Sequence, residues 1–407
     1  MGDNFRPRDA RDVESAVRWA LGQGRPVEIV GRGSKRPIGR PAQADLILDL
    51  SGVAGVTLYE PEELVLTAKA GTPLAEIQSL LDDSGQQLAF EPLDVGHIFS
   101  TGGGEGSIGG VLAANLAGPR RVKAGSARDH FLGFSAVSGR GETFKSGGRV
   151  VKNVTGYDLC KLLAGSWGTL AVMTEVTVKV LPKPETETSV LIRGLDAPRA
   201  VTAMTRAMGS SCDVSGAAHL PRRVAAHLPE VAGHGAAVTL LRLEGFAVSV
   251  VHRTSRLEQL VREFGELTRL AERASQAAWR AVRDVAPLVR SDSGSERALW
   301  RMSVPPSHGA PLGESLARQI GAEILYDWAG GLLWISVEPN NDAGAAAIRE
   351  AMAGAGHALL VRGPATVRAA IDVFEPQSAG LAALTRRVKR GFDPQGVLNP
   401  GRMWAGV

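Results

Sequence analysis

Glycine residues in three stretches of the chain have the spacing of phosphate-binding loops. Residues 31–35 read Gly-Arg-Gly-Ser-Lys, residues 100–110 are mostly glycine, and residues 165–168 read Gly-Ser-Trp-Gly. Because glycine has no side chain, its backbone amide can approach a bulky anion closely. Successive exposed amides form a concave nest for phosphate oxygens. The sequence therefore predicts that loops distant along the chain close around the phosphates of one dinucleotide.

Single parts of these stretches are open to more than one interpretation. Residues 31–35 follow an apolar run and suit a phosphate-facing turn, but a plain strand-to-loop turn has the same residue types. The pattern Gly104-x-Gly106-x-x-Gly109 matches the nicotinamide-dinucleotide fingerprint. That fingerprint has meaning only directly after a strand, and residues 91–97 are turn formers, so we interpret the match as accidental. Residues 108–115 predict a loop that enters a short helix, whose first amides are free for an anion.

Length and charge limit the classes of function. A chain of 407 residues predicts two domains, with a third as an alternative. Its net charge of +4 is spread along the sequence, and aromatic residues make up only 5%. Nucleic-acid binding needs a basic stripe with stacking aromatics, so we expect no nucleic-acid partner.

Cysteine and hydropathy patterns limit the location. Cys160 and Cys212 are too few for an iron–sulfur cluster, which needs about four thiolates. Any iron–sulfur relay is therefore expected on another chain. No apolar stretch reaches the length of a transmembrane segment or resembles a leader. We expect a cytoplasmic protein, with peripheral attachment to the inner membrane through partners as an alternative.

The remaining chemical motifs point to no catalytic group. The eight histidines are scattered, and no His-Glu-x-x-His or His-x-His cluster is present. A nucleophile elbow, a P-loop and a paired-carboxylate motif are missing from the sequence as well. We therefore expect no metal site, and the catalytic residues stay open.

Periodicity predicts an α/β region before residue 184. We expect a helix over 9–21 and a helix from Thr72, the proposed N-cap, to about Ser84, with Pro73 at its first position and Glu76 near the position that a capping box expects. Expected strands cover 26–30, 45–50, 64–70, 131–137 and 171–181. The stiff Pro182-Lys183-Pro184 junction predicts a domain boundary.

Strands and helices alternate between residues 185 and 390, which predicts an α+β cap domain. Expected strands cover 188–192, 238–243, 299–304, 332–337 and 358–361, and expected helices cover 198–208, 250–270, 309–320 and 343–352. Residues 391–407 form a turn-rich tail. The predicted division is thus 1–184, 185–390 and 391–407.

An ordered set of motifs resembles a known family. The set comprises Gly109-Gly110 with Asn115, Arg128-Asp129, residues 153–159 (Asn-Val-Thr-Gly-Tyr-Asp-Leu), and residues 165–175. It resembles the FAD-binding domain of the vanillyl-alcohol oxidase and p-cresol methylhydroxylase (PCMH) type. Residues 116–121 (Leu-Ala-Gly-Pro-Arg-Arg) and the tail 393–403 resemble more narrowly the FAD-binding E subunits of bacterial glycolate oxidase (glycolate dehydrogenase) complexes.

This resemblance implies a fold and a cofactor site. The fold is an α+β protein whose two-lobed, PCMH-type FAD-binding domain of two α/β subdomains precedes an α+β cap, with the tail returning to the flavin domain. Covalent relatives carry a histidine where Ser34 and Lys35 stand, so the flavin is expected to be noncovalent. Val111 and Trp167 depart from the Asn and Glu that the family often has. The implied FAD-binding residues are Gly31, Arg32, Gly33, Ser34, Lys35, Ser107, Ile108, Gly109, Gly110, Asn115, Gly118, Gly125, Ser126, Asp129, Gly165, Ser166, Gly168, Val172, Asn399 and Arg402.

The resemblance also implies a role in a complex. It points to an electron-transfer subunit that works with a homologous flavin subunit and an iron–sulfur subunit to oxidise glycolate, or D-lactate, to the 2-oxo acid. One alternative is a self-sufficient FAD-dependent 2-hydroxy-acid dehydrogenase, for which Arg301 and Arg362 are candidate carboxylate ligands. Another is a structural subunit that has lost its flavin.

Overall fold

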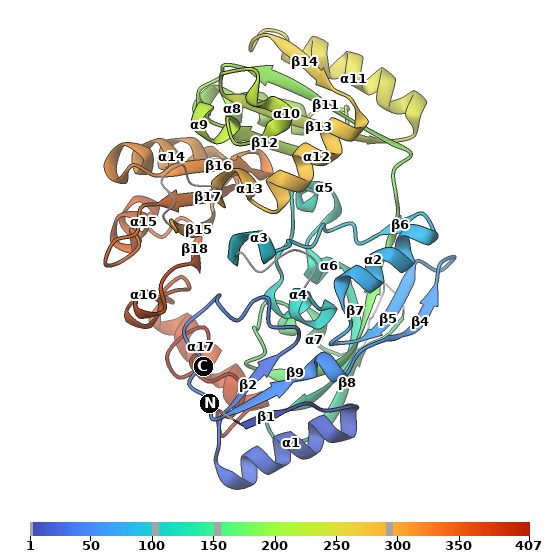
Figure 1. Ribbon diagram of the computed structural model, residues 1–407, viewed down its shortest axis with the longest axis vertical. Helices are drawn as coiled ribbons and strands as arrows, with labels where there is room; N and C mark the ends of the chain where they lie inside the picture. Colours follow the sequence, from blue (N-terminus) through green and yellow to red (C-terminus); the bar gives the residue numbers. More distant parts are fainter. Residues whose placement is uncertain (1–2, 100–105, 150–155, 290–295) are drawn as a thin grey trace.

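The computed structural model describes residues 3–99, 106–149, 156–289 and 296–407. Most of the second glycine stretch, including Gly104, and residues 153–155 of the family motif lie outside the described residues. The described chain forms sheets of three, five and eight strands and a two-stranded ribbon. Figure 1 shows the smaller sheets in the lower half of the molecule and the eight-stranded sheet in the upper half.

The first lobe is a parallel sheet with one long helix. Strands pair in the order β1 (Asp3–Phe5), β3 (Leu46–Asp49) and β2 (Val27–Val30). Helix α1 (Ala10–Gln23) begins at Asp9, whose carboxylate accepts the amides of Arg11 and Asp12, both at 2.9 Å. The residues after β2 form the first glycine loop, so this sheet positions that loop.

The second lobe is an antiparallel sheet covered by helices. Its order is β4 (Val56–Glu60), β5 (Val65–Lys69), β9 (Ala171–Lys179), β7 (Phe131–Ser138) and β8 (Thr143–Gly147). Helices α2 (Leu74–Asp83), α4 (Ile108–Ala114) and α7 (Leu159–Leu163) share a hydrophobic core with this sheet. Short helices α3 (Gly96–Phe99), α5 (Arg121–Ala124) and α6 (Ala127–His130) and the ribbon of β6 (Gln86–Gln87) and β10 (Leu181–Pro182) complete it.

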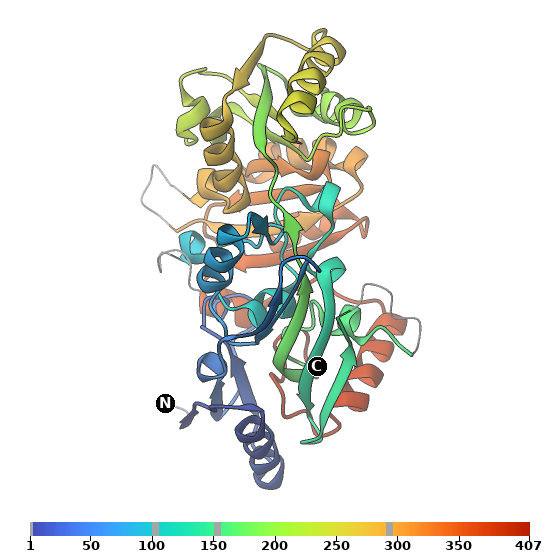
Figure 2. The same cartoon turned by 90° about the vertical axis from the view of Figure 1, so that its right-hand side faces the viewer.

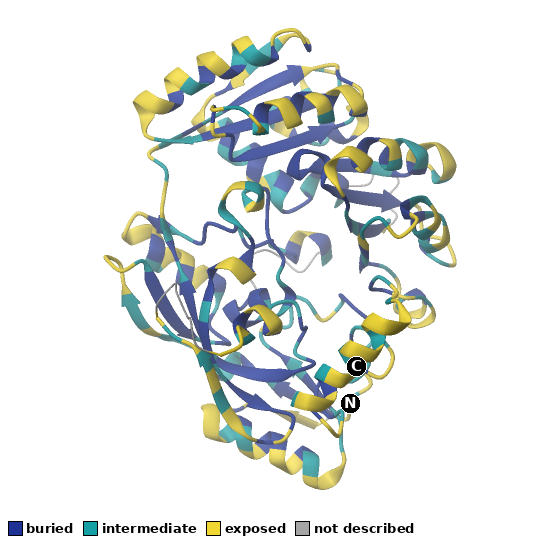
Figure 3. Cartoon of the chain, turned by 180° about the vertical axis from the view of Figure 1, so that it is seen from behind, coloured by how far each residue is buried: buried dark blue, intermediate teal, exposed yellow. Residues whose placement is uncertain are grey.

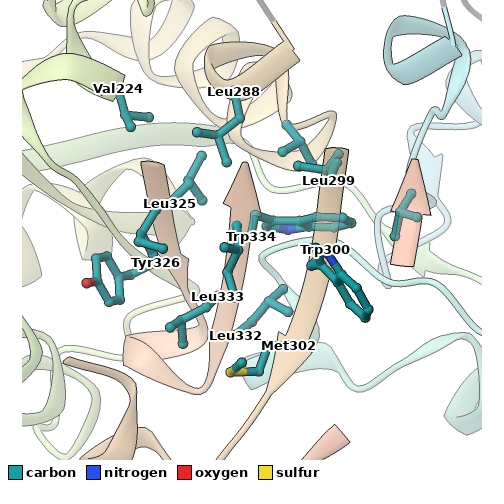
Figure 4. Close-up of a cluster of buried hydrophobic side chains, with 14 of the residues drawn as sticks. Val224, Leu288, Leu299, Trp300, Met302, Leu325, Tyr326, Leu332, Leu333 and Trp334 are labelled. Carbon is teal, nitrogen blue, oxygen red and sulfur yellow. The ribbon is translucent and has the colours of Figure 1, made fainter. Parts of the chain in front are cut away.

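The upper half is one antiparallel sheet of eight strands. Their order is β14 (Leu267–Leu270), β11 (Thr186–Arg193), β13 (Val238–Gly245), β12 (Gly216–Leu220), β16 (Glu323–Asp327), β17 (Leu332–Val337), β15 (Ala298–Ser303) and β18 (His357–Arg362). Figure 4 shows its core, where Leu325, Trp334 and Leu299 project from neighbouring strands. Tight packing of these large side chains makes the sheet a rigid platform.

Helices cover both faces of this sheet. Helices α8 (Ala197–Met208), α11 (Ala247–Val261) and α14 (Pro306–Ile320) pack on one face. Helices α12 (Glu272–Arg283) and α13 (Ala286–Val289) lie on the other face, which is turned toward the lower half. Figure 3 shows the outer surfaces of these helices exposed and the strands buried. Shorter helices are α9 (Arg222–Ala225), α10 (Pro229–Ala232), α15 (Ala345–Met352) and α16 (Ala365–Ala370).

The end of the chain returns to the lower half. Helix α17 (Ala379–Phe392) lies beside the five-stranded sheet, as Figure 2 shows. The ring centres of Phe392 and Phe144 are 5.9 Å apart. The tail then adds Leu398 beside Val27 at the edge of the parallel sheet. The predicted return of the tail is thus present in the fold, whereas the division at residues 184 and 390 stays a prediction.

Two expectations about the elements were wrong. Pro73, not Thr72, is the N-cap of α2, because the Thr72 hydroxyl already accepts the Gly55 amide at 2.9 Å and donates to the Lys69 carbonyl at 2.6 Å. The expected helix 250–270 is α11 followed by the separate strand β14.

Among the helices of the described chain, none combines the length and the apolar character that a membrane crossing requires. Both cysteines are buried free thiols. In the same part of the chain, no group of three or more metal-binding side chains comes together.

Candidate cofactor site

A cleft lies where the two lobes and the tail meet. The space inside it, including solvent at its open mouth, is about 740 Å³. The residues that line it come from the first glycine loop, α4, the loop before β9, and the tail. Of the residues implied by the family resemblance, those in the lining are Gly31, Arg32, Gly33, Ser34, Lys35, Ser107, Gly109, Gly110, Gly168, Asn399 and Arg402.

The first glycine loop offers backbone donors to this cleft. In the described chain, no backbone acceptor is bonded to the amides of residues 32–35, although the Arg36 amide bonds to the Gly33 carbonyl at 3.0 Å. Gly33 has a φ of 79°, a left-handed conformation that favours glycine. A Cβ added at Gly31 would collide with the Ser107 hydroxyl. These amides are therefore free to bind an anion, and that they hold phosphates stays a prediction.

The first backbone amides of helix α4 are not free, contrary to the expectation. The amides of Ile108 and Gly109 are already bonded to the carbonyls of Thr72 (3.1 Å) and Ala70 (2.9 Å), and the Gly110 amide donates to the Ser107 hydroxyl at 3.4 Å. The prediction of free amides at this helix end was therefore wrong, because oxygen atoms of the chain itself accept these amides. A Cβ at Gly109 would lie 2.8 Å from the Ala70 carbonyl oxygen, so glycine here allows helix and strand to pack closely.

The loop before β9 is bonded to the tail through Asn399. The Asn399 side chain accepts the Ile29 amide at 2.7 Å and donates to the Trp167 carbonyl at 2.7 Å. A Cβ at Gly168, whose φ is 74°, would lie 2.7 Å from the Asn399 amide nitrogen. One side chain therefore joins the first lobe to the loop on the opposite wall of the cleft.

A buried ion pair holds the tail in this position. The Lys389 ammonium donates to the Thr169 carbonyl (2.6 Å), the Leu398 carbonyl (2.8 Å) and the Asp393 carboxylate (2.7 Å). All three of its donors are used, which a buried ammonium requires. Asp393 also accepts the amides of residues 397 and 398 at 3.0 and 2.8 Å. Burial lowers the pKa of Lys389, and Asp393 opposes that shift.

Lys35 and Arg402 are two of the four cationic residues that line the cleft, together with Arg32 and Arg36. Burial lowers the pKa of Lys35 to about 8, although Asp94 partly offsets this effect. Arg402 donates to the Lys35 carbonyl at 2.7 Å, and burial lowers its pKa to about 10. At neutral pH both side chains stay protonated, so they provide positive charge beside the amide nest.

The other residues implied by the resemblance are not part of the described lining of the cleft. Asn115 ends α4 and accepts the Arg128 amide at 3.0 Å. Ser126 and Asp129 form a capping box at α6, and a Cβ at Gly125 would lie 3.0 Å from Asp129. Gly118 accepts the Trp328 indole N–H at 3.1 Å. The remaining residues are buried or packed beside these segments, namely Ile108, Gly165, Ser166 and Val172.

Some lining residues were missed by sequence reasoning. They include Ala70, Ala113, Ala114, Trp167 and Met173. Ala113 lies one helical turn beyond Gly109 and Gly110, so helical periodicity could have identified it. Ala70 and Met173 are in neighbouring strand segments, and nothing in a single sequence indicates that these lie beside α4.

Comparisons with known proteins agree with this geometry. Residues 4–147 match the family model described as FAD binding domain, and residues 374–403 match the C-terminal domain of FAD linked oxidases. The chain is 34% identical over 390 residues to glycolate oxidase subunit GlcE of Escherichia coli (strain K12), which covers 96% of this chain and 95% of that protein. The chain belongs to the GlcE family.

More distant relatives match only part of the chain. Glycolate oxidase subunit GlcD of Bacillus subtilis (strain 168) is 33% identical over 168 residues, 40% of this chain and 34% of that protein. D-lactate dehydrogenase of Anaerostipes hadrus is 34% identical over 147 residues, 36% of this chain and 29% of that protein. Among solved structures, p-cresol methylhydroxylase with substrate bound superposes with a TM-score of 0.70 at 14% identity, covering 98% of this chain and 88% of that chain.

These findings confirm the predicted fold class, the FAD cofactor and an FAD-dependent oxidoreductase. The residues present also fit this cofactor, because free backbone amides and the cations Lys35 and Arg402 lie together at one cleft. Which of these residues contact FAD stays a prediction.

Proposed function

We propose that this chain is the FAD-binding electron-transfer subunit of a multi-subunit glycolate oxidase (glycolate dehydrogenase) that converts glycolate, or D-lactate, to the 2-oxo acid. The observation that carries the proposal is the cleft closed by the first glycine loop, α4, the loop before β9 and the tail. It is supported by the match to GlcE over nearly the whole chain. FAD would supply the transfer of two electrons from the 2-hydroxy acid to a later acceptor.

The residues of the chain would bind and orient this cofactor noncovalently. Amides of residues 32–35 would hold the pyrophosphate, because a nest of N–H groups suits anionic oxygens. Lys35 and Arg402 would add positive charge at the same wall. Asn399 and Lys389 would position the loops around the cofactor. The flavin domain of residues 1–184, the cap of residues 185–390 and the tail of residues 391–407 would be the corresponding units.

Substrate oxidation would be centred on a homologous flavin subunit, with an iron–sulfur subunit as electron acceptor. Histidine, a common general base, is not among the described residues that line the cleft. The two thiols are too few for a cluster on this chain. We infer a cytoplasmic complex, with attachment to the inner membrane through the partners as an alternative.

A self-sufficient dehydrogenase is the second candidate. Of its two candidate carboxylate ligands, Arg362 is occupied, because it donates to the carbonyls of Arg297 (2.8 Å) and Ile98 (3.0 Å). Arg301 has a buried Nε with no acceptor. That observation alone keeps the candidate open.

The test is the visible spectrum of the purified full chain before and after addition of glycolate alone. We expect flavin absorbance bands that persist after glycolate is added, because the general base lies on a partner. Bleaching by glycolate would instead support the self-sufficient enzyme, and a colourless protein would support a structural subunit. Capture of partner chains from the native host would then identify the complex.

A further inference from the structure

A second pocket lies in the cap, apart from the cofactor cleft. Its lining comes from β12, β16, α9, α14 and the start of α8, and the space inside it, including solvent at its open mouth, is about 990 Å³. Figure 1 shows α9, α14 and β16 side by side in the upper half. In the described chain, this pocket and the cofactor cleft share no lining residue. A bound flavin therefore gives no reason for this pocket.

A row of three polar side chains crosses the sheet at this pocket. Thr239 on β13, His219 on β12 and Tyr326 on β16 lie opposite one another in register on neighbouring strands. The Thr239 hydroxyl and the His219 Nδ1 are 2.9 Å apart, and the ring centres of His219 and Tyr326 are 5.7 Å apart. The three residues are only 0%, 1% and 2% exposed. Buried polar groups of this kind are costly unless each one has a partner.

The hydroxyl of Tyr326 lacks such a partner. This residue has a ring contact with His219 but, among the described residues, no hydrogen bond. Figure 4 shows its hydroxyl pointing away from the other labelled side chains, and Tyr326 lines the pocket. Gly313 of α14 leaves room for the hydroxyl, because a Cβ there would lie 2.1 Å from the hydroxyl oxygen. Since a buried tyrosine hydroxyl normally finds a partner, its position here indicates a ligand that supplies one.

The polar groups at this pocket favour an uncharged ligand. Burial lowers the pKa of His219 to about 4, although Asp196 opposes this shift. Burial also raises the pKa of Tyr326. Both side chains are therefore neutral at pH 7. The charged residues of the lining are Arg222 and Arg223, opposed by Asp196, Glu314 and Glu323. Because the carboxylates outnumber the guanidinium groups, an anion gains no net attraction at this pocket.

We propose that this pocket binds an uncharged small molecule with a carbon ring or branched chain and one hydroxyl or carbonyl group. The Tyr326 hydroxyl would donate a hydrogen bond to the oxygen of this ligand, and His219 would provide the second polar contact. Apolar residues of the lining, such as Leu195, Val224 and Ile324, would cover the carbon skeleton. Ligand pockets commonly combine an apolar wall with a few polar groups that fix orientation. The site makes no use of FAD, so it goes beyond the proposed function.

Ligand-observed NMR titration of the full chain, loaded with FAD, tests this site. The probes are cyclohexanol, cyclohexanone and benzyl alcohol, with cyclohexanecarboxylate as the charged counterpart. We expect saturable binding of at least one uncharged probe that weakens about three- to tenfold in Tyr326→Phe, because that change removes one neutral hydrogen bond. Tyr157→Phe makes the same change at a tyrosine that is 89% exposed, so this matched control should bind as the parent does.

Two further measurements separate loss of the site from loss of the fold. Ala317→Phe places a ring in the pocket, so it should abolish binding of the uncharged probes. Tyr326→Phe should unfold at the same urea concentration as the parent or a higher one, because its hydroxyl has no partner among the described residues. A lower midpoint for this variant would show that the hydroxyl is satisfied within the folded chain, which would contradict the proposal.

Three results of the titration would overturn the proposal. The first is an absence of saturable binding of all three uncharged probes to the parent chain. The second is equal affinity of the parent and Tyr326→Phe, and the third is tighter binding of cyclohexanecarboxylate than of cyclohexanol. Flavin content is measured in every sample. A chain that lacks FAD but binds cyclohexanol through Tyr326 would contradict the proposed function and support this site.

Discussion

Asn399 and Lys35 show how single residues shape the cofactor site. Asn399 has a φ of 43°, a conformation that asparagine tolerates better than most residues, and both ends of its side chain are bonded to different walls of the cleft. Lys35 is different, because the one hydrogen bond of its ammonium among the described residues is a 3.5 Å contact to the Ser34 hydroxyl. A cation held this loosely in the cleft is available for an anionic ligand.

At the residue scale, we predict that FAD binding depends on pH through Lys35. The pKa of this ammonium is about 8, and a bound pyrophosphate would raise it. Below pH 8 the Lys35 side chain is already protonated. Above pH 8 it must take up a proton from solvent when FAD binds. The dissociation constant of FAD should therefore rise by up to about tenfold per pH unit above 8.

Equilibrium titration of the flavin-free chain with FAD between pH 7 and 9.5 checks this prediction. Lys35→Arg, which stays protonated throughout, should bind with little pH dependence. Lys35→Met should bind more weakly at pH 7 and also lack the dependence. An identical pH profile for the parent and Lys35→Met would contradict the role of this ammonium.

At the scale of elements, a buried network of charges fixes the cap on the flavin domain. Arg242 on β13 donates to both carboxylate oxygens of Glu91 at 2.8 and 3.0 Å, and Arg120 donates to Glu244. The Arg242 side chain is only 1% exposed. Burial opposes the ionisation of Glu91, but the charges of Arg242 and Arg120 outweigh it and lower the Glu91 pKa. Two segments more than a hundred residues apart are thereby locked together.

We predict that Arg242→Met lowers the free energy of unfolding by about 3–5 kcal/mol, because the buried Glu91 carboxylate loses one of the two positive charges that stabilise it. Urea unfolding measures this change. Arg269→Met is the matched control, since Arg269 forms an equally direct pair with Glu258 at 2.5 Å but is exposed. Its loss should cost less than about 1 kcal/mol. Equal costs for the two variants would show that the buried network does not lock the halves.

The elements themselves could be predicted to different degrees. Strongly periodic segments such as α1, β13 and β17 lie close to the expected ranges. Strand β12 was missed because its residues Gly216–Leu220 are largely small and carry little strand signal. The helix expected over 250–270 was too long, because the apolar residues of β14 continue the pattern of α11 across a loop. Periodicity alone does not mark where one element ends and another begins.

At the scale of the whole molecule, the site depends on contacts between the ends of the chain. Lys389 and Thr169 are separated by 220 positions, and their 2.6 Å hydrogen bond seats the tail against the loop before β9. Composition and spacing revealed the glycine loop, whereas the roles of Asn399 and Arg402 came from the family resemblance. Neither source indicated that the first amides of α4 would bond to carbonyls of the chain itself, because Ala70 and Thr72 approach this helix only in the folded chain.

The central claim is that FAD occupies the cleft between the first glycine loop and the tail. Ala113 provides a direct test, because it lines this cleft on α4 and tolerates a larger side chain without strain in the helix backbone. The ratio of flavin to protein is measured for the parent chain, for Ala113→Phe, and for Ala317→Phe, which fills a separate pocket on α14. The account predicts flavin in the parent and in Ala317→Phe, and little flavin in a folded Ala113→Phe. Full flavin content in Ala113→Phe would contradict it.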